Sequence, residues 1–179
     1  MVEVDGYRVM TDTVLSRRTS PVQFFGPARF HPAPIPLTQL TGIDAVVISH
    51  NHYDHLDEAT IKKLAAEGTR FFLPFGIGVV LDHWGVPAAQ ITELNWWHKA
   101  TIGELNITAT PARHYPGRGL FDYGATQWAS WMHPGPKTPR LLQRRPWLLR
   151  TVQRNWETSR PLRCQHRHSR RVRSRPSLD

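Results

Sequence analysis

The sequence is poor in cysteine and in long hydrophobic runs. Its 179 residues include a single cysteine, Cys164, so no internal disulfide can form and a reducing compartment is compatible with the chain. The longest apolar run, residues 71–81, contains Pro74 and is too short to span a bilayer, which takes about 20 residues. The first residues are mixed and acidic and do not resemble a signal peptide. We therefore expect a soluble, cytoplasmic protein.

Acidic residues are scarce in the last quarter of the chain. Residues 1–132 hold 10 of the 23 Lys and Arg and 12 of the 14 Asp and Glu, so this part is slightly acidic. Residues 133–179 hold the other 13 basic and 2 acidic residues and show no sustained hydrophobic period. Such a composition cannot bury enough apolar surface to offset the entropy of ordering. We expect one domain over 1–132, followed by a basic, Pro- and Arg-rich, disordered tail over 133–179.

The most informative motif is the hexapeptide His-Asn-His-Tyr-Asp-His at residues 50–55. It follows an apolar, β-branched run over 45–49, which is typical of a buried strand. A helical pattern over 58–67 comes next, with Asp57 as the expected N-cap and Gly68 as the stop. This order places the hexapeptide at the carboxyl edge of a sheet, where α/β folds build their sites.

Four side chains of the hexapeptide can bind a metal: His50, His52, Asp54 and His55. His50 and His52 are two residues apart and can point the same way from an extended backbone, whereas Asp54 and His55 point elsewhere. The spacing therefore favours two adjacent metals over one.

The remaining patterns predict further strands and helices on both sides of this motif. We expect a hairpin turning at Asp5-Gly6, strands over 70–73, 91–94 and 126–132, a hairpin over 101–109, and a second helix over 76–84. A long loop over 13–43, rich in Pro and aromatics, would cross the surface near the site. Phe24-Phe25 and Trp96-Trp97 are interpreted as core residues, with a lipid-facing entrance as the alternative.

The hexapeptide is the H-x-H-x-D-H signature of the metallo-β-lactamase superfamily, which this chain resembles. Further segments look like the branch that contains the phospholipases D acting on N-acyl-phosphatidylethanolamine, namely residues 30–36, 84–87, 96–97, 110–114 and 117–120. The resemblance covers roughly residues 2–132. It implies an α/β (α+β) fold, the αββα sandwich, of which only the first half is evident here.

The resemblance ends abruptly after Trp131. Relatives continue with a strand and a Ser-Gly-Asp segment whose Asp bridges both metals, but this chain has no Asp between Asp122 and Asp179. We interpret the domain as truncated, with an out-of-frame reading as the leading explanation of the tail.

The resemblance also implies a ligand set. His50, His52 and His114 would hold one metal, while Asp54 and His55 would hold the second and Asp54 would act catalytically by orienting the attacking water. Zinc is the expected metal, with iron or manganese as alternatives. The family holds two metals, and we expect at most one here. Four other histidines are interpreted as structural or surface residues, namely His31, His83, His98 and His133.

These inferences predict a zinc-dependent hydrolase, phosphodiesterase- or phospholipase D-like, acting on a small-molecule or phospholipid-like substrate and impaired by the missing downstream ligands. Three alternatives remain open: a lactonase-like metallohydrolase, a non-functional fragment, and weak polyanion binding through the basic tail. We expect no specific nucleic-acid partner and no transmembrane segment. Peripheral contact with a membrane is compatible with the sequence.

Overall fold

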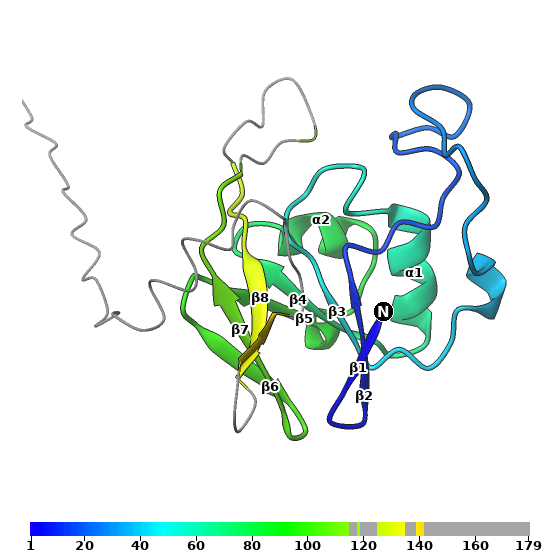
Figure 1. The fold of residues 1–179 in the computed structure, drawn as a ribbon. Helices are drawn as coiled ribbons and strands as arrows, with labels where there is room; N and C mark the ends of the chain where they lie inside the picture. Colours follow the sequence, from blue (N-terminus) through cyan, green and yellow to red (C-terminus); the bar gives the residue numbers. More distant parts are fainter. Residues whose placement is uncertain (115–117, 119–124, 135–138, 142–179) are drawn as a thin grey trace, which may run out of the picture. The chain divides into compact units, whose positions relative to one another are not determined.

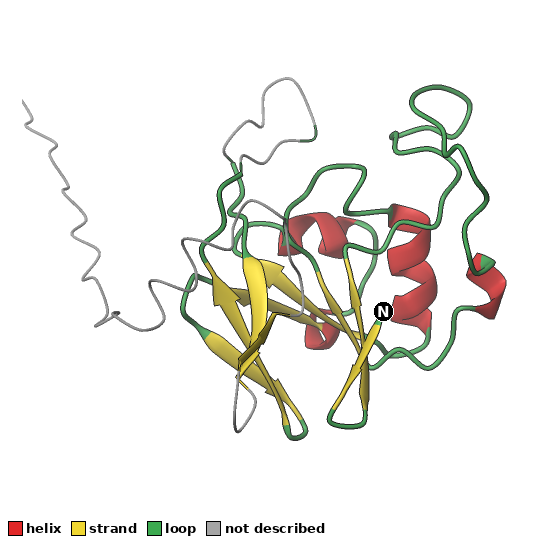
Figure 2. Cartoon of the chain, in the orientation of Figure 1, coloured by secondary structure: helices red, strands yellow, loops and turns green. Residues whose placement is uncertain are grey.

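The structure, a computed structural model, describes residues 1–114, 118, 125–134 and 139–141. They all belong to the first of two compact units, Met1–Leu148 and Leu149–Asp179. The described strands form two sheets, and the helices cover one face of the first sheet (Figures 1 and 2). No helix among the described residues is long and apolar enough to cross a membrane. Most of the predicted tail lies outside the described residues.

The first sheet has the order β1-β2-β3-β4-β5. Its strands are β1 (Val2–Val4), β2 (Tyr7–Thr11), β3 (Ala45–Val47), β4 (Arg70–Pro74) and β5 (Ile91–Leu94). β1 and β2 are antiparallel, and the pairs from β2 to β5 are parallel. The hairpin turns at Asp5 and Gly6 as predicted, with φ of 51° and 82°, as a type I′ turn requires.

The second sheet is antiparallel throughout, with the order β6-β7-β8-β9. Its strands are β6 (Lys99–Ile102), β7 (Leu105–Thr110), β8 (Ser130–Pro134) and β9 (Pro139–Leu141). The strand predicted over 126–132 begins only at Ser130 in the structure. Before that residue the backbone bonds to segments outside the second sheet: Gln127 N–H donates to Phe75 O and Ala129 N–H to Ser49 O, both at 2.9 Å. β9 continues the sheet beyond residue 132, the predicted end of the domain.

Two hydrophobic clusters join three layers of structure. One fills the space between the sheets, where Val47 and Phe72 of the first sheet meet Ile107 and Trp131 of the second. The other lies between the first sheet and the helices α1 (Glu58–Ala66) and α2 (Gly78–His83). Two short 3-10 turns, η1 (Leu37–Gln39) and η2 (Ala88–Gln90), complete the regular elements of the described residues. This helix–sheet–sheet arrangement confirms the predicted α/β class.

β3 is the central strand of this arrangement. All three of its residues are fully buried, as the continuous apolar run predicts for a parallel strand covered on both faces. The helix α1 starts at the predicted residue and ends one residue before the predicted end at 67. Gly68, which follows, has a φ of +83°, a conformation that suits glycine best. Asp57 occupies the N-cap position, but its side chain makes no cap hydrogen bond, so the predicted cap is wrong in this detail.

Candidate metal centre

The ends of strands from both sheets bring the candidate ligands together. The hexapeptide follows β3 of the first sheet, and His114 follows β7 of the second. The ring centroid of His50 lies 4.5 Å from that of His52, 4.1 Å from that of His55 and 4.0 Å from that of His114. The His52 and His114 rings are 5.1 Å apart. The convergence expected from the sequence is therefore present.

These side chains form two groups that share His50. In the first, His50, His52 and His114 each offer a ligand atom, and in the second, His50, Asp54 and His55 do so. Within each group the ligand atoms all lie within 4.8 Å of one another. Metal–ligand bonds of about 2.1 Å allow two ligand atoms of one ion to lie up to ~4.2 Å apart, so small shifts suffice for binding. Both donor sets fit a divalent metal ion.

Asp12 is a site residue that sequence reasoning missed. It directly follows β2, which pairs in parallel with β3 so that Thr11 lies opposite Val47. Its Oδ1 accepts a hydrogen bond from Ser49 N–H at 2.6 Å. Its Oδ2 lies 2.7 Å from both Ser49 Oγ and His55 Nδ1. Asp12 therefore connects the first sheet to the residues that carry the ligands.

This network sets the proton positions on two histidines. An ionised Asp12 only accepts hydrogen bonds, so Ser49 Oγ–H donates to it, and His50 Nδ1, 2.7 Å from Ser49 Oγ, must donate to Ser49. His55 Nδ1–H donates to Asp12 in the same way. In the neutral form of each ring, Nε2 then carries the lone pair. It lies 3.0 Å from His52 Nδ1 in the case of His50 and 3.3 Å from Asp54 Oδ2 in the case of His55. Second-shell hydrogen bonds of this kind fix the tautomer and ring orientation of metal-ligating histidines.

One side of the cluster is open to solvent. His50 is buried, with 1% of its surface exposed, whereas the Asp54 side chain is 62% exposed and has Oδ2 3.3 Å from His55 Nε2. Water can therefore reach the Asp54 carboxylate. On the buried side, the fully buried Trp131 donates Nε1–H to Ile48 O at 2.8 Å, two residues before His50.

Arg118 binds the backbone of the loop over residues 50–56, which carries four of the candidate ligands. Its Nη1 donates to Asn51 O, within the hexapeptide, and to Leu56 O, directly after it, both at 3.0 Å. The guanidinium lies 4.0 Å from the centre of the Tyr53 ring and 5.1 Å from that of Trp84. Burial lowers the pKa of Arg118, which nevertheless stays cationic because arginine titrates so far above neutral pH.

Replacing Arg118 with alanine should loosen this loop. Two carbonyl oxygens lose their donor, which costs roughly 1–3 kcal/mol where such groups are buried. We expect the melting temperature to fall by about 4–8 °C and metal affinity to fall with it. Arg113→Ala, at an exposed position near His114, is the matched control and should change neither. Equal melting curves for the two variants would contradict a holding role for Arg118.

The other histidines that the structure describes take no part in the cluster. His133 is buried, and its Nδ1 donates to Asn106 O at 2.8 Å while its Nε2 lies 2.8 Å from Asp5 Oδ2, so it serves a structural role. His31, His83 and His98 are exposed. Their interpretation as structural or surface residues is consistent with these positions.

Comparison with known sequences decides the family. Residues 7–139 match the β-lactamase superfamily domain. The chain belongs to the metallo-β-lactamase superfamily. It is 48% identical over 137 residues to an uncharacterized protein of Mycobacterium tuberculosis, covering 76% of this chain and 37% of that protein. It is 34% identical over 140 residues to the N-acyl-phosphatidylethanolamine-hydrolyzing phospholipase D 1 of Caenorhabditis elegans, covering 73% of this chain and 39% of the enzyme.

The superfamily fold is also found in a solved structure. An isothiocyanate hydrolase from Delia radicum gut bacteria superposes with a TM-score of 0.56 at 19% identity, over 86% of this chain and 63% of the hydrolase. At this identity the likeness concerns the fold alone. The chain spans less than two-fifths of the length of the two curated relatives, 37% and 39%. The chain belongs to this superfamily, and its convergent histidines are candidate metal ligands.

Proposed function

We propose that this chain carries the site of a metal-dependent phosphodiesterase of the phospholipase D type. The observation that carries the proposal is the pair of adjacent donor groups sharing His50, in a network that directs Nε2 of His50 and His55 toward other candidate ligands of the same group. The similarity to a nematode phospholipase D supports the substrate class. The substrate would be a phospholipid-like phosphodiester.

The candidate residues would have different roles in this site. His50, His52 and His114 would hold the first metal, while Asp54 and His55 would hold the second. Asp12 would keep His55 and, through Ser49, His50 in the ligating tautomer. Asp54, on the open side, would orient water for attack on phosphorus. A metal bound here supplies Lewis acidity, which polarises the phosphoryl oxygen and lowers the pKa of water. Zinc is our preferred ion, and iron or manganese suit the same donors.

The two donor groups should differ in their affinity for a metal ion. Three histidines suffice for one zinc, as catalytic sites of this type show. Beyond the shared His50, the second group contributes only Asp54 and His55, of which Asp54 is largely exposed. We therefore expect at most one tightly held metal per chain and slow turnover, because one metal cannot stabilise both the attacking and the leaving oxygen.

A hydrolysis assay on the zinc-loaded full chain tests the proposal. We expect slow, chelator-sensitive cleavage of a chromogenic phosphodiester, and a decrease of at least ~10-fold in Asp54→Asn if this residue is a ligand. Asp82→Asn, at an exposed position on α2, is the matched control and should keep the parent rate. Cleavage of a lactone but not of the phosphodiester would favour the lactonase alternative. Rapid turnover with two tightly held metals would show that residues outside the described ligand set complete the site.

A further inference from the structure

The loop between β2 and β3 combines exposed aromatic rings with positive charge. We call residues 17–30 the arginine–phenylalanine loop. It contains Arg17, Arg18 and Arg29, and the whole stretch between Asp12 and Asp44 contains no Asp or Glu. No acidic side chain within this stretch can therefore compensate its charge.

Three phenylalanines of this loop project into solvent. Phe24 is 85% exposed, Phe25 is 74% exposed and Phe30 is fully exposed. The interpretation of Phe24 and Phe25 as core residues is therefore wrong. An isolated exposed hydrophobic residue needs no explanation, but bulky rings gathered on one loop mark an interaction surface.

Hydrogen bonds within the loop hold its base together. Arg29 N–H donates to Arg17 O at 2.9 Å, and Thr19 N–H donates to Pro27 O at 3.1 Å. Arg18 and the Gln23 side chain exchange further bonds, with Arg18 N–H donating to Gln23 Oε1 and Gln23 Nε2–H donating to Arg18 O, both at 3.1 Å. The phenylalanines are thus carried on a closed loop rather than on an unconstrained strand.

The guanidinium groups of the loop keep their charge available. Arg18 donates to Gln23 O and Gly26 O, and Arg29 donates to Ser16 O and Val14 O. These acceptors are carbonyl oxygens, which do not neutralise a charge. Arg17 and Arg29 are exposed. The loop therefore presents cations beside apolar rings, which complements the anionic headgroups and apolar interior of a lipid bilayer.

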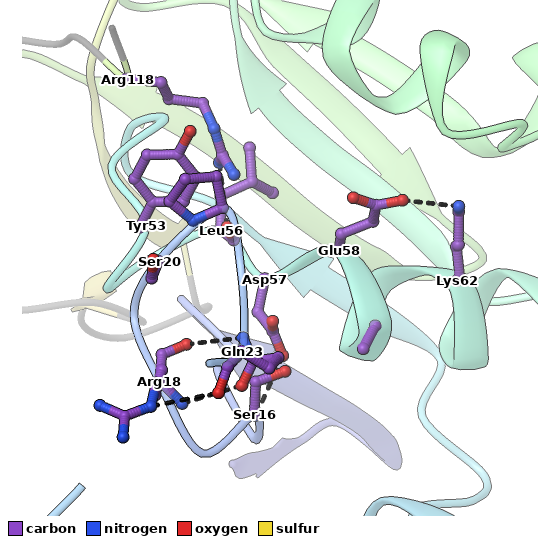
Figure 3. Close-up of a pocket in the computed structure, with 12 residues that line it drawn as sticks. Ser16, Arg18, Ser20, Gln23, Tyr53, Leu56, Asp57, Glu58, Lys62 and Arg118 are labelled. Atoms are coloured by element: carbon purple, nitrogen blue, oxygen red, sulfur yellow. Dashed lines mark hydrogen bonds and ion pairs between the residues drawn. The ribbon is translucent and has the colours of Figure 1, made fainter. Parts of the chain in front are cut away.

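The same loop borders a cavity whose other side includes two residues close in sequence to the candidate metal ligands. The cavity has a volume of about 280 Å³, and Arg18, Ser20 and Gln23 lie on the side of the loop (Figure 3). Tyr53 and Leu56, from the segment that carries the metal ligands, line it as well. A surface that binds this loop would therefore lie near the segment that carries the candidate ligands.

We propose that the arginine–phenylalanine loop docks onto membranes rich in anionic lipids. Phe24, Phe25 and Phe30 enter the boundary between headgroups and acyl chains, and Arg17 and Arg29 bind lipid phosphates. The inference goes beyond the proposed reaction, since it concerns where the chain binds and holds whether or not the site turns over.

The basic tail would also bind anionic vesicles, so the test must report on the loop itself. A dye sensitive to polarity is attached at Phe24→Cys in a Cys164→Ser background of the full chain. The matched control carries the dye at Glu104→Cys, in the turn between β6 and β7. That turn lies at the opposite end of the sheets from the metal cluster, because β7 runs from it toward His114 (Figure 1).

Vesicles of phosphatidylcholine with about 30% phosphatidylglycerol should shift the emission of the dye at position 24 to the blue, and pure phosphatidylcholine should do so far less. The dye at position 104 should not respond. Salt at ~0.5 M should release tail-driven binding while part of the shift at position 24 persists, because insertion of apolar rings is not screened. In unlabelled protein, Phe24→Ser combined with Phe25→Ser should reduce this salt-resistant binding at least ~10-fold, because two rings no longer insert into the membrane.

Three results would overturn the proposal. The first is vesicle binding with no response at position 24, which would assign the binding to the tail. The second is an equal response at positions 24 and 104, which would indicate non-specific adsorption. The third is a shift that depends on protein concentration without vesicles, which would make a second copy of the chain the occupant.

Discussion

The His50→Ala variant is expected to lose stoichiometric metal binding. His50 belongs to both donor groups and is buried at the centre of the cluster, so its removal reduces each group to two ligands. Loss of an outer hydrogen-bonding partner typically costs ~10–100-fold in metal affinity, so loss of a direct ligand should cost more than ~100-fold. Titration with zinc under competition from a chromogenic chelator measures the change.

His98→Ala is the matched control for this variant. His98 is exposed and lies outside both donor groups. It should bind zinc as the parent chain does, and circular dichroism should show both variants folded. Unchanged zinc affinity in a folded His50→Ala protein would mean that metal binds elsewhere, for example at histidines of the tail.

The Asp12→Asn variant should lower metal affinity by ~10–100-fold while leaving the fold intact. Asparagine keeps the size of the side chain but replaces one carboxylate oxygen with an amide group, so it cannot accept bonds from both Ser49 and His55 at one charged oxygen. The backbone of Asp12 has φ of +44°, a conformation that asparagine tolerates better than most residues. The expected loss therefore reports on hydrogen bonding rather than on backbone strain.

Asp12 could support metal binding or only the fold, and measurements of zinc affinity and thermal stability in Asp12→Asn distinguish the two roles. Asp82→Asn serves as the control, since Asp82 is exposed on α2. If Asp12 only stabilised the fold, the melting temperature of the metal-free protein would fall and zinc affinity would follow that fall. We expect zinc affinity to fall with little change in the melting of the metal-free protein.

The candidate ligands of the hexapeptide could be predicted from the sequence because their signal is local. The run over 45–49 and the hexapeptide that follows carry the strand, the loop and four metal-capable side chains within eleven residues, 45–55. His114 required the family resemblance, since no feature of the residues around it points to a metal. The structure places it 4.0 Å from His50 between ring centroids.

Asp12 was missed because its role depends on strand pairing. It lies 37 residues before Ser49, and only the parallel register of β2 with β3 brings the two together. The rule that located the hexapeptide could have found it, since Asp12 is a polar residue directly after a strand. The missing information was that the hairpin at the start of the chain joins the same sheet as β3.

Asp57 and the phenylalanine pair show two other limits of local patterns. Asp57 stands at the start of α1 as predicted, but its Oδ2 accepts from Leu15 N–H at 3.3 Å and from Ser16 N–H at 3.1 Å and so anchors the loop after β2. Phe24 and Phe25 were expected in the core on composition, yet they are exposed on that loop. Capping and burial both depend on what a distant segment places beside the residue.

Metal content of the purified full chain, loaded with zinc and freed of excess ion, tests the central claim most directly. The account predicts close to one zinc per chain, lost in His50→Ala and retained in His98→Ala, with any second zinc held weakly because Asp54 and His55 alone complete its site. Absence of bound metal in the folded parent protein would contradict the account, as would two tightly held ions that survive the His50→Ala substitution.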